Sequence, residues 1–257
     1  MPGSSKPSSR PASADAERAG ERIAKYLARA GLCSRREAER WIAAGRVAVD
    51  GAVLSTPATL VDSRSAVTVD GKPVGAPDRR RVWRYHKPRG LICTNADPQG
   101  RPTVFDALPG DLPRVVSVGR LDFNSEGLLL LTNDGGLAGR LERGDWTRRY
   151  RVRAFGAVDE ARLAGLADGA VVDGIAYGPI QARLDRREGR NAWLTVSLTE
   201  GRNREIKRVF ESLGLAVNRL IRTGYGPFLL GGLARGTLAE VTEKVLGEQL
   251  GRADRRR

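Results

Sequence analysis

The interpretation of this sequence starts from the segment Gly119-Arg-Leu-Asp-Phe-Asn-Ser-Glu-Gly127, which is followed directly by Leu128-Leu-Leu-Leu-Thr-Asn-Asp-Gly135. Four consecutive leucines bounded by polar turn residues are typical of a short strand buried on both faces. A loop that carries Asp122 between a glycine and such a strand holds the carboxylate in a fixed direction, as catalysis requires. An aspartate in a turn also commonly hydrogen-bonds its own backbone, so a structural Asp122 remains the alternative. Glu126 and Asp134 are the rival carboxylates of this segment.

A second segment, Thr147-Arg-Arg-Tyr150-Arg-Val152, places an aromatic residue inside a basic strand. Side chains alternate along a strand, so Tyr150 faces away from its two arginine neighbours. An aromatic ring near cations suits the binding of an unstacked base, because the ring stacks on the base while the charges attract phosphate. A tyrosine of the hydrophobic core is the alternative interpretation.

A third segment, Glu200-Gly-Arg-Asn-Arg-Glu-Ile-Lys-Arg-Val-Phe210, predicts a helix with one apolar face. Its basic residues Arg204, Lys207 and Arg208 lie close together on the other side of that helix. A cation from this set is expected to pair with Asp122 and to keep its carboxylate ionised.

The chain of 257 residues is strongly basic: 44 Lys and Arg against 30 Asp and Glu give a net charge of +14. Such a charge indicates a polyanionic partner, above all a nucleic acid. Two cysteines and one histidine are too few for a zinc tetrad, so metal chemistry is not expected and carboxylates are the most plentiful catalytic candidates. The sequence has no secretory signal and no apolar run long enough to span a bilayer, which predicts a cytoplasmic protein without a membrane partner.

The common cofactor motifs are missing from the sequence. There is no P-loop, which argues against nucleotide triphosphates, and no glycine-rich dinucleotide motif. The missing glycine motif also argues against an RNA methyltransferase.

Before this larger region, the N-terminal part predicts a small module of two helices and two hairpins. Ser34-Arg-Arg-Glu37 is a capping-box pattern that begins a helix at 35–44, and the two hairpins turn at Asp-Gly pairs within 46–53 and 67–74. This order resembles the S4 RNA-binding domain. The resemblance implies that four arginines, otherwise an ordinary solvated surface, contact the RNA backbone. They are Arg35, Arg36, Arg40 and Arg46.

Composition and patterning divide the chain into five parts. We expect a disordered tail at 1–20, the S4-like domain at 21–75, a basic linker at 76–82, a catalytic domain at 83–250 and a basic tail at 251–257. Strands and helices do not alternate strictly in the larger domain, which favours an α+β fold with a mixed, largely antiparallel sheet and a central cleft. The expected strands are 83–86, 128–132, 150–155 and 193–198, and the expected helices are 136–142, 160–166 and 205–213.

Taken in this order behind an S4-like module, the three segments resemble the ribosomal RNA pseudouridine synthases that carry an N-terminal S4 domain. The resemblance spans residues 21–246. Arg101-Pro-Thr-Val-Phe-Asp106, and Arg219-Leu-Ile-Arg222 with Gly226-Pro227, are most similar to the large-subunit synthase B branch. The resemblance implies roles for individual residues: Asp122 as the catalytic aspartate, Tyr150 as the stacking residue, Lys207 as the partner of Asp122, Leu220 as the apolar contact of the base, and Arg120, Arg202 and Arg204 as substrate-binding residues.

The same resemblance implies that the protein isomerises uridine to pseudouridine in ribosomal RNA or a pre-ribosomal particle, in 23S rather than 16S RNA. The sequence has no heptad seam and no large exposed apolar helix face, so a monomer is expected. This implied reaction requires no external cofactor. It needs a carboxylate near C1′ and access to a uridine flipped out of the RNA stack. The sequence leaves open whether Asp122 attacks C1′ or removes a 2′ proton from a glycal-type intermediate. The alternative function is a non-catalytic S4-type ribosome-associated factor, which would need no aspartate with a paired cation and a stacking tyrosine.

Overall fold

The computed structural model describes residues 20–254, which fall into two units with their boundary between Arg79 and Arg80. The predicted tails at 1–19 and 255–257 lie outside the described residues. Residues 251–254, predicted as part of the basic tail, form the last turn of a helix. Among the helices of the described part, none is both long and apolar enough to cross a membrane.

The first unit contains the two predicted helices and the two predicted hairpins. The Ser34 hydroxyl accepts a hydrogen bond from the Glu37 N–H at 3.1 Å and the Glu37 carboxylate accepts one from the Ser34 N–H at 3.4 Å, so the capping box is confirmed. Asp50 and Asp70 have φ values of 51° and 52°, and each precedes a glycine of positive φ, which is the backbone of a two-residue hairpin turn. The elements are β1 (Glu21–Arg22), α2 (Ile23–Arg29), α3 (Arg35–Ala43), β2 (Val47–Val49), β3 (Ala52–Val53), β4 (Leu60–Val61), β5 (Val67–Val69) and β6 (Lys72–Pro73).

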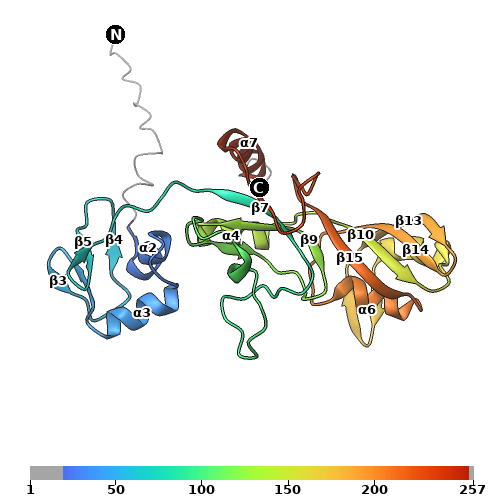
Figure 1. The fold of residues 1–257 in the computed structure, drawn as a ribbon, viewed down its shortest axis with the longest axis horizontal. Coiled ribbons are helices and arrows are strands. Elements are labelled where there is room, and N and C mark those ends of the chain that lie inside the picture. The colour runs from blue at the N-terminus through green and yellow to red at the C-terminus, as the bar shows by residue number, and fades with distance from the viewer. Residues whose placement is uncertain (1–19, 255–257) are drawn as a thin grey trace, which may run out of the picture. The chain divides into compact units, whose positions relative to one another are not determined.

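The second unit is built on a nine-stranded sheet in the order β13-β14-β10-β15-β9-β7-β17, with β8 paired to β9 and β16 to β15 (Figure 1). The described strands pair antiparallel throughout this sheet except where β15 runs parallel to β9 over two residue pairs. The strands are β7 (Val82–Lys87), β8 (Val116–Val118), β9 (Glu126–Thr132), β10 (Arg148–Phe155), β13 (Ile180–Glu188), β14 (Asn191–Leu198), β15 (Ala216–Tyr225), β16 (Phe228–Leu229) and β17 (Leu238–Glu240). The predicted α+β class with a largely antiparallel sheet is therefore confirmed.

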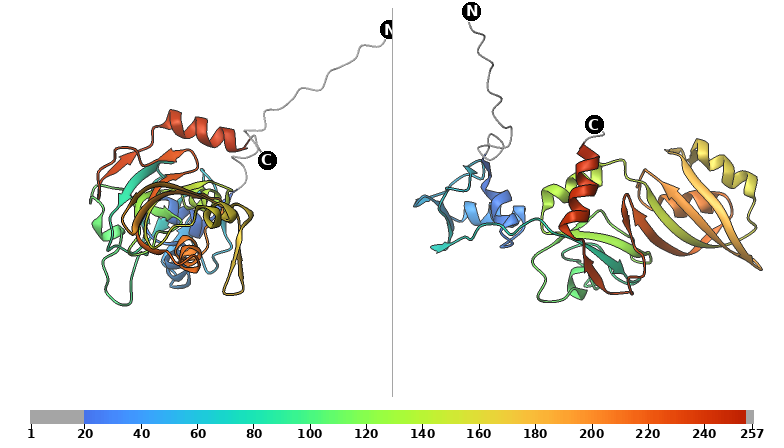
Figure 2. Two further views of the ribbon diagram at one scale, coloured as in Figure 1. Left: turned by 90° about the vertical axis from the view of Figure 1, so that its right-hand side faces the viewer. Right: turned by 90° about the horizontal axis from the view of Figure 1, so that it is seen from above.

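Helices cover this sheet in two places. Helices α5 and α6 pack on the β13-β14-β10-β15 part, and α4 packs on β9, where Leu128 and Leu130 lie in its apolar cluster. Leu129 and Leu131 lie in a separate cluster on the other face of β9, so the predicted burial of this strand on both faces is confirmed. Helix α7, red in Figure 2, follows β17. The remaining elements are α4 (Gly135–Arg143), α5 (Glu160–Gly165), α6 (Glu205–Ser212), α7 (Glu243–Asp254), the 3₁₀ turns η1 (Phe105–Ala107) and η2 (Leu166–Asp168), and the hairpin of β11 (Ala170–Val172) and β12 (Ile175–Tyr177).

The predicted linker at 76–82 is shorter than expected at its C-terminal end. Arg80 donates to the Asp134 carboxylate at 2.8 Å and Arg81 donates to Glu240 at 2.9 Å, so both arginines are fixed on the second unit. Val82 already belongs to β7. Both partners, Asp134 and Glu240, belong to the second unit. The chain therefore joins this unit at Arg80, two residues before β7 begins.

Candidate active site

A cleft of about 810 Å³ opens in the second unit next to the place where β15 meets β9. The cleft is lined by residues of the segment 92–101, by the loop before β9, by inward side chains of β10 and β15, and by the turn before α6. The structure thus brings together the three segments singled out in the sequence, although about eighty residues separate the first from the last.

Asp122 and Lys207 form an ion pair at the cleft. The Lys207 Nζ lies 3.2 Å from the Asp122 Oδ2, and the two residues are 85 positions apart in the sequence. The side chain of Asp122 is 33% exposed and that of Lys207 is 15% exposed, so the carboxylate is reachable from the cleft while its partner is largely covered. Partial burial weakens solvent screening of the pair.

Lys87 holds the loop that carries Asp122 in place through hydrogen bonds to the loop backbone. This lysine is fully buried at the end of β7, and its Nζ donates to the backbone carbonyls of Pro88 at 3.0 Å, Asp122 at 3.1 Å and Ser125 at 2.9 Å. Burial of the ammonium lowers the pKa of Lys87 to about 8. Sequence reasoning missed Lys87, since a single lysine at the end of an apolar strand gives no signal that it is buried.

Tyr150 and Leu220 lie on the same face of the sheet beside the cleft. Tyr150 is opposite Arg222 in the β10–β15 ladder, and Leu220 is opposite Val152, which makes Tyr150 and Leu220 diagonal neighbours. Tyr150 is 8% exposed and Leu220 is 7% exposed, and both line the cleft. The two thus supply an aromatic ring and an apolar side chain within reach of one small ligand.

The three predicted substrate-binding arginines, Arg120, Arg202 and Arg204, also line the cleft. Arg202 is partly committed, because its guanidinium contacts the carboxylate of Glu200. Arg204 is the N-cap residue directly before α6 and lies in the left-handed region with a φ of 54°, a conformation that is uncommon for a residue other than glycine.

Two further residues of the cleft were not predicted as site residues. Glu205 is buried, which raises the pKa of its carboxyl, and Arg222 is buried and donates to the Leu128 carbonyl at 2.7 Å. Within the described part of the chain, the Glu205 Oε1 and one terminal nitrogen of Arg222 have no hydrogen-bond partner. Both side chains therefore keep unused hydrogen-bonding capacity at the cleft.

The rival carboxylates are engaged in structural contacts. The Glu126 side chain is 3% exposed and pairs with Arg219 and Arg235; its burial works to raise the pKa, but the arginines leave it below the usual range. Asp134 accepts hydrogen bonds from the first N–H groups of α4 and so acts as the helix cap. Of the three carboxylates only Asp122 lines the cleft.

In the first unit, the four predicted RNA-contacting arginines do not all have the same environment. Arg35, Arg36 and Arg40 are exposed on or beside α3, and within residues 20–254 they make no ion pair. Arg46 is exposed as well, but its guanidinium donates to both carboxylate oxygens of Asp70, at 2.9 and 2.5 Å. The guanidinium of Arg46 is therefore already paired with a carboxylate, whereas those of the other three arginines are not in the described part of the chain.

Among the described residues, no group of three or more His, Cys, Asp or Glu side chains is arranged to hold a metal ion. The chemistry that this arrangement supports is that of one accessible carboxylate with a paired ammonium, next to a flat apolar surface and several arginines. Such a site fits a nucleotide whose base leaves the RNA stack.

Comparison with known proteins agrees with this geometry. Residues 81–212 match the family described as RNA pseudouridylate synthase, and residues 21–66 match the S4 domain. An uncharacterized RNA pseudouridine synthase of Rickettsia prowazekii is 46% identical over 231 residues, which cover 89% of this chain and 97% of the relative. Ribosomal large subunit pseudouridine synthase B of Pseudomonas aeruginosa is 45% identical over 245 residues, covering 90% of this chain and 63% of the relative.

A crystal structure of a pseudouridylate synthase superposes with a TM-score of 0.61 at 26% sequence identity, covering 89% of this chain and 99% of the other. The family match extends over half of the chain, and the relative from Rickettsia is aligned over nearly its full length. The chain therefore belongs to the family of RNA pseudouridylate synthases and carries an S4 domain in front of its synthase domain.

Proposed function

We propose that this enzyme converts a uridine of ribosomal RNA to pseudouridine, and that its substrate is the RNA of the large subunit. The observation that carries the proposal is the Asp122–Lys207 ion pair in a cleft shared with Tyr150 and Leu220. Relatives described as ribosomal large subunit pseudouridine synthase B, at about 45% identity, support 23S RNA over 16S RNA as the substrate.

The proposed reaction breaks the N1–C1′ bond of the uridine, turns the uracil and forms a C5–C1′ bond. The proton on C5 is lost and N1 gains one, so atoms and electrons balance without a redox partner. Carboxylates act on glycosidic carbons elsewhere as nucleophiles or as stabilisers of positive charge. Whether Asp122 attacks C1′ or removes the 2′ proton, it acts as a carboxylate, and the ammonium of Lys207 orients that carboxylate through the contact with its Oδ2.

In this proposal the other cleft residues hold the uridine. Tyr150 stacks on the flipped uracil and Leu220 contacts it from the side, so the detached base stays in the cleft while it turns. Arg120, Arg202 and Arg204 bind the phosphates that flank the uridine, because a guanidinium pairs two phosphate oxygens at once.

The S4 domain has a separate task in the proposal. Flipping one nucleotide costs a few kcal/mol, and phosphate contacts made elsewhere offset that cost while they fix the register on the RNA. Arg35, Arg36 and Arg40 are the residues we assign to these contacts, because they are exposed and carry no competing carboxylate among the described residues.

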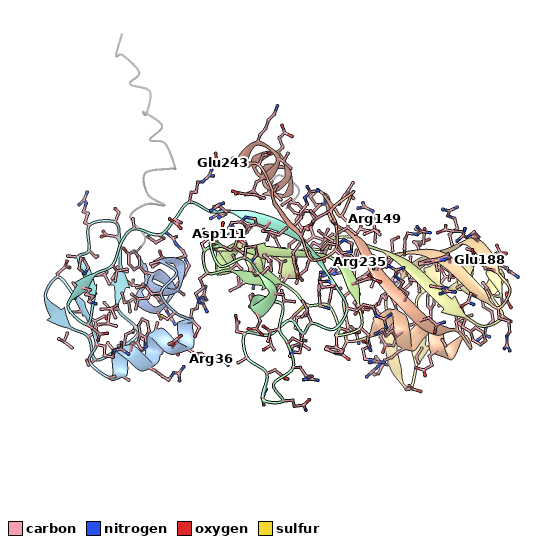
Figure 3. All side chains as sticks on the ribbon, viewed as in Figure 1. Arg36, Asp111, Arg149, Glu188, Arg235 and Glu243 are labelled. Atoms are coloured by element: carbon pink, nitrogen blue, oxygen red, sulfur yellow. The ribbon has the colours of Figure 1, made fainter. Side chains whose placement is uncertain are left out.

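The test is pseudouridine mapping on unmodified 23S and 16S RNA, free and in ribosomal particles, with the purified protein and no added cofactor. Asp122→Asn removes the charge of the proposed catalytic group, and Asp111→Asn is the matched control at an exposed carboxylate outside the cleft (Figure 3). We expect one new pseudouridine in 23S RNA with the wild type and the control, and none with Asp122→Asn, which still binds RNA.

Two results contradict parts of the proposal. A new pseudouridine in 16S RNA alone overturns the choice of substrate but not the reaction. Tight RNA binding at physiological salt without modification of any RNA or particle overturns the enzymatic function and leaves a ribosome-associated binding factor.

A further inference from the structure

The side of the β13-β14-β10-β15 sheet that faces away from α5 and α6 is covered with arginines. We call this surface the arginine face and define it by Arg149, Arg151, Arg153, Arg183, Trp193 and Arg219. It arises from strict alternation in β10, where Tyr150, Val152 and Ala154 enter the core and the three arginines point the other way. In Figure 3, Arg149 and Glu188 mark two ends of this part of the sheet.

The strand register concentrates these residues at the middle of the face. Arg153 of β10 lies opposite Trp193 of β14 on one side and opposite Arg219 of β15 on the other. The guanidinium carbon of Arg151 lies 4.8 Å from the Trp193 ring centre, and that of Arg219 lies 6.0 Å from it. An aromatic residue is thus enclosed by stacked guanidinium groups on an open sheet.

The charges of this face are only partly neutralised. Arg183 pairs with Asp185 at 2.9 Å, and Arg219 pairs with Glu126. Within residues 20–254, Arg151 and Arg153 have no carboxylate partner, and the Nε of Arg153 is buried without a hydrogen-bond acceptor. Arg151 and Arg153 therefore keep binding capacity for an anion at the middle of this face.

The arginine face is separate from the cleft. Tyr150 and Leu220, which line the cleft, lie in the core cluster beneath α6, on the opposite side of the same strands. A ligand on the arginine face therefore does not compete with the uridine for space.

We infer that the arginine face is a second RNA-binding surface, which holds an unpaired segment of the substrate RNA outside the catalytic cleft. Guanidinium groups pair with phosphates, and their planes stack on exposed bases. RNA is the occupant that matches both features, since it presents a dense row of negative charge and flat aromatic surfaces together. The inference rests on the proposed function to the extent that the RNA bound here is the substrate.

The test compares Arg151→Gln/Arg153→Gln with Arg140→Gln/Arg143→Gln, which removes two exposed charges from α4 instead. Binding to a long 23S fragment and to a short stem-loop containing the target uridine is measured across a salt series. For the long fragment, we expect the slope of log Kd against log salt to fall by about one for each lost phosphate contact, and affinity to fall about tenfold. KM on the long fragment should rise in parallel, whereas kcat and the activity on the short stem-loop should not change.

A double variant with the wild-type salt slope and affinity overturns the inference, and so does an equal loss in the α4 control. Arg183→Gln, at a side chain that is 78% exposed, is a second variant that should fold normally and should lower the slope by itself. If the wild type modifies no RNA but the slope still falls in the double variant, the inference stands and the proposed function fails. If the wild type modifies RNA and the slope does not change, the proposed function stands and the inference fails.

Discussion

Replacement of Lys87 by methionine tests how the catalytic loop is held in place. Lys87 donates to the carbonyls of Pro88, Asp122 and Ser125, and the Asp122 carbonyl also accepts from the Ser125 N–H at 3.0 Å. The variant therefore leaves two buried carbonyls without this donor, at a cost of about 1–3 kcal/mol each. In the wild type, burial of the ammonium lowers the pKa of Lys87 from 10.5 to about 8, which corresponds to a cost of about 3 kcal/mol in folding free energy. The methionine variant does not have this cost.

The two terms partly cancel, so we expect the free energy of unfolding at pH 7 to change by no more than about 3 kcal/mol. Activity should fall, because the loop that carries Asp122 loses the hydrogen bonds from Lys87 that hold it in place. A displacement of about 1 Å at a catalytic group lowers turnover about 100-fold, and we expect a loss of this size in kcat with little change in KM. Urea unfolding and single-turnover pseudouridine formation measure the two quantities, with Lys244→Met on the exposed surface of α7 as the control. A Lys87→Met enzyme with wild-type kcat would refute the reasoning.

The same lysine predicts a pH dependence of stability. Its pKa of about 8 in the folded protein lies below the unfolded value of 10.5, so between these pH values the unfolded chain binds more protons. The free energy of unfolding of the wild type should therefore rise with pH, by about 1 kcal/mol between pH 8 and pH 9, relative to Lys87→Met. Equal pH profiles of the two proteins would contradict the burial of a charged Lys87.

Three further predictions concern single residues. Lys207→Met should lower kcat about 100-fold while Lys207→Arg keeps most of the activity, because the cation beside Asp122 matters more than its shape; equal losses would contradict this. In Gly127→Ala the new Cβ would lie 2.3 Å from the Arg222 carbonyl oxygen at a φ of +105°, so the variant should lose about 3 kcal/mol or more of stability. Gly189→Ala, at a φ of +59° with open space around it, should lose only about 1 kcal/mol. Ser34→Ala should destabilise the first unit by about 1 kcal/mol in thermal unfolding.

The sequence predicted those elements whose local pattern agrees with their final environment. The leucine run of β9 and the capping box of α3 belong to this group, since burial and hydrogen bonding there depend on neighbours along the chain. Strand β13 was missed because its pattern, Ile-Gln-Ala-Arg-Leu-Asp-Arg-Arg-Glu, is polar except on the face that meets the core. Strand β15 was missed for a different reason, because Arg222, a charged residue, is buried on the core face beside Leu220 and breaks the apolar alternation.

The sequence predicted which residues belong to the candidate site, but not the contacts that hold these residues in place. The family resemblance placed Asp122, Tyr150 and Lys207 in one site, and no pattern within the sequence alone fixes contacts between residues that far apart. Lys87 was missed because lysines are almost always exposed, and only the tertiary structure reveals the backbone carbonyls that surround its ammonium. Arg46 shows the converse: its basic character predicted an RNA contact, but the partner that occupies it, Asp70, is 24 residues away.

The place of the cleft follows from the one parallel contact in the sheet. Strand β15 pairs with β9 in parallel over only two residue pairs, Ile221 with Glu126 and Arg222 with Gly127, so the hydrogen-bonded ladder between these strands is short. Beyond these pairs β9 is preceded by the Asp122 loop, which therefore lies beside β15 without being part of the sheet. Gly127 makes this approach possible, because any side chain there would meet the backbone of Arg222. The residue that lets the two strands meet thus also sets the distance between the carboxylate loop and the strand that carries Leu220.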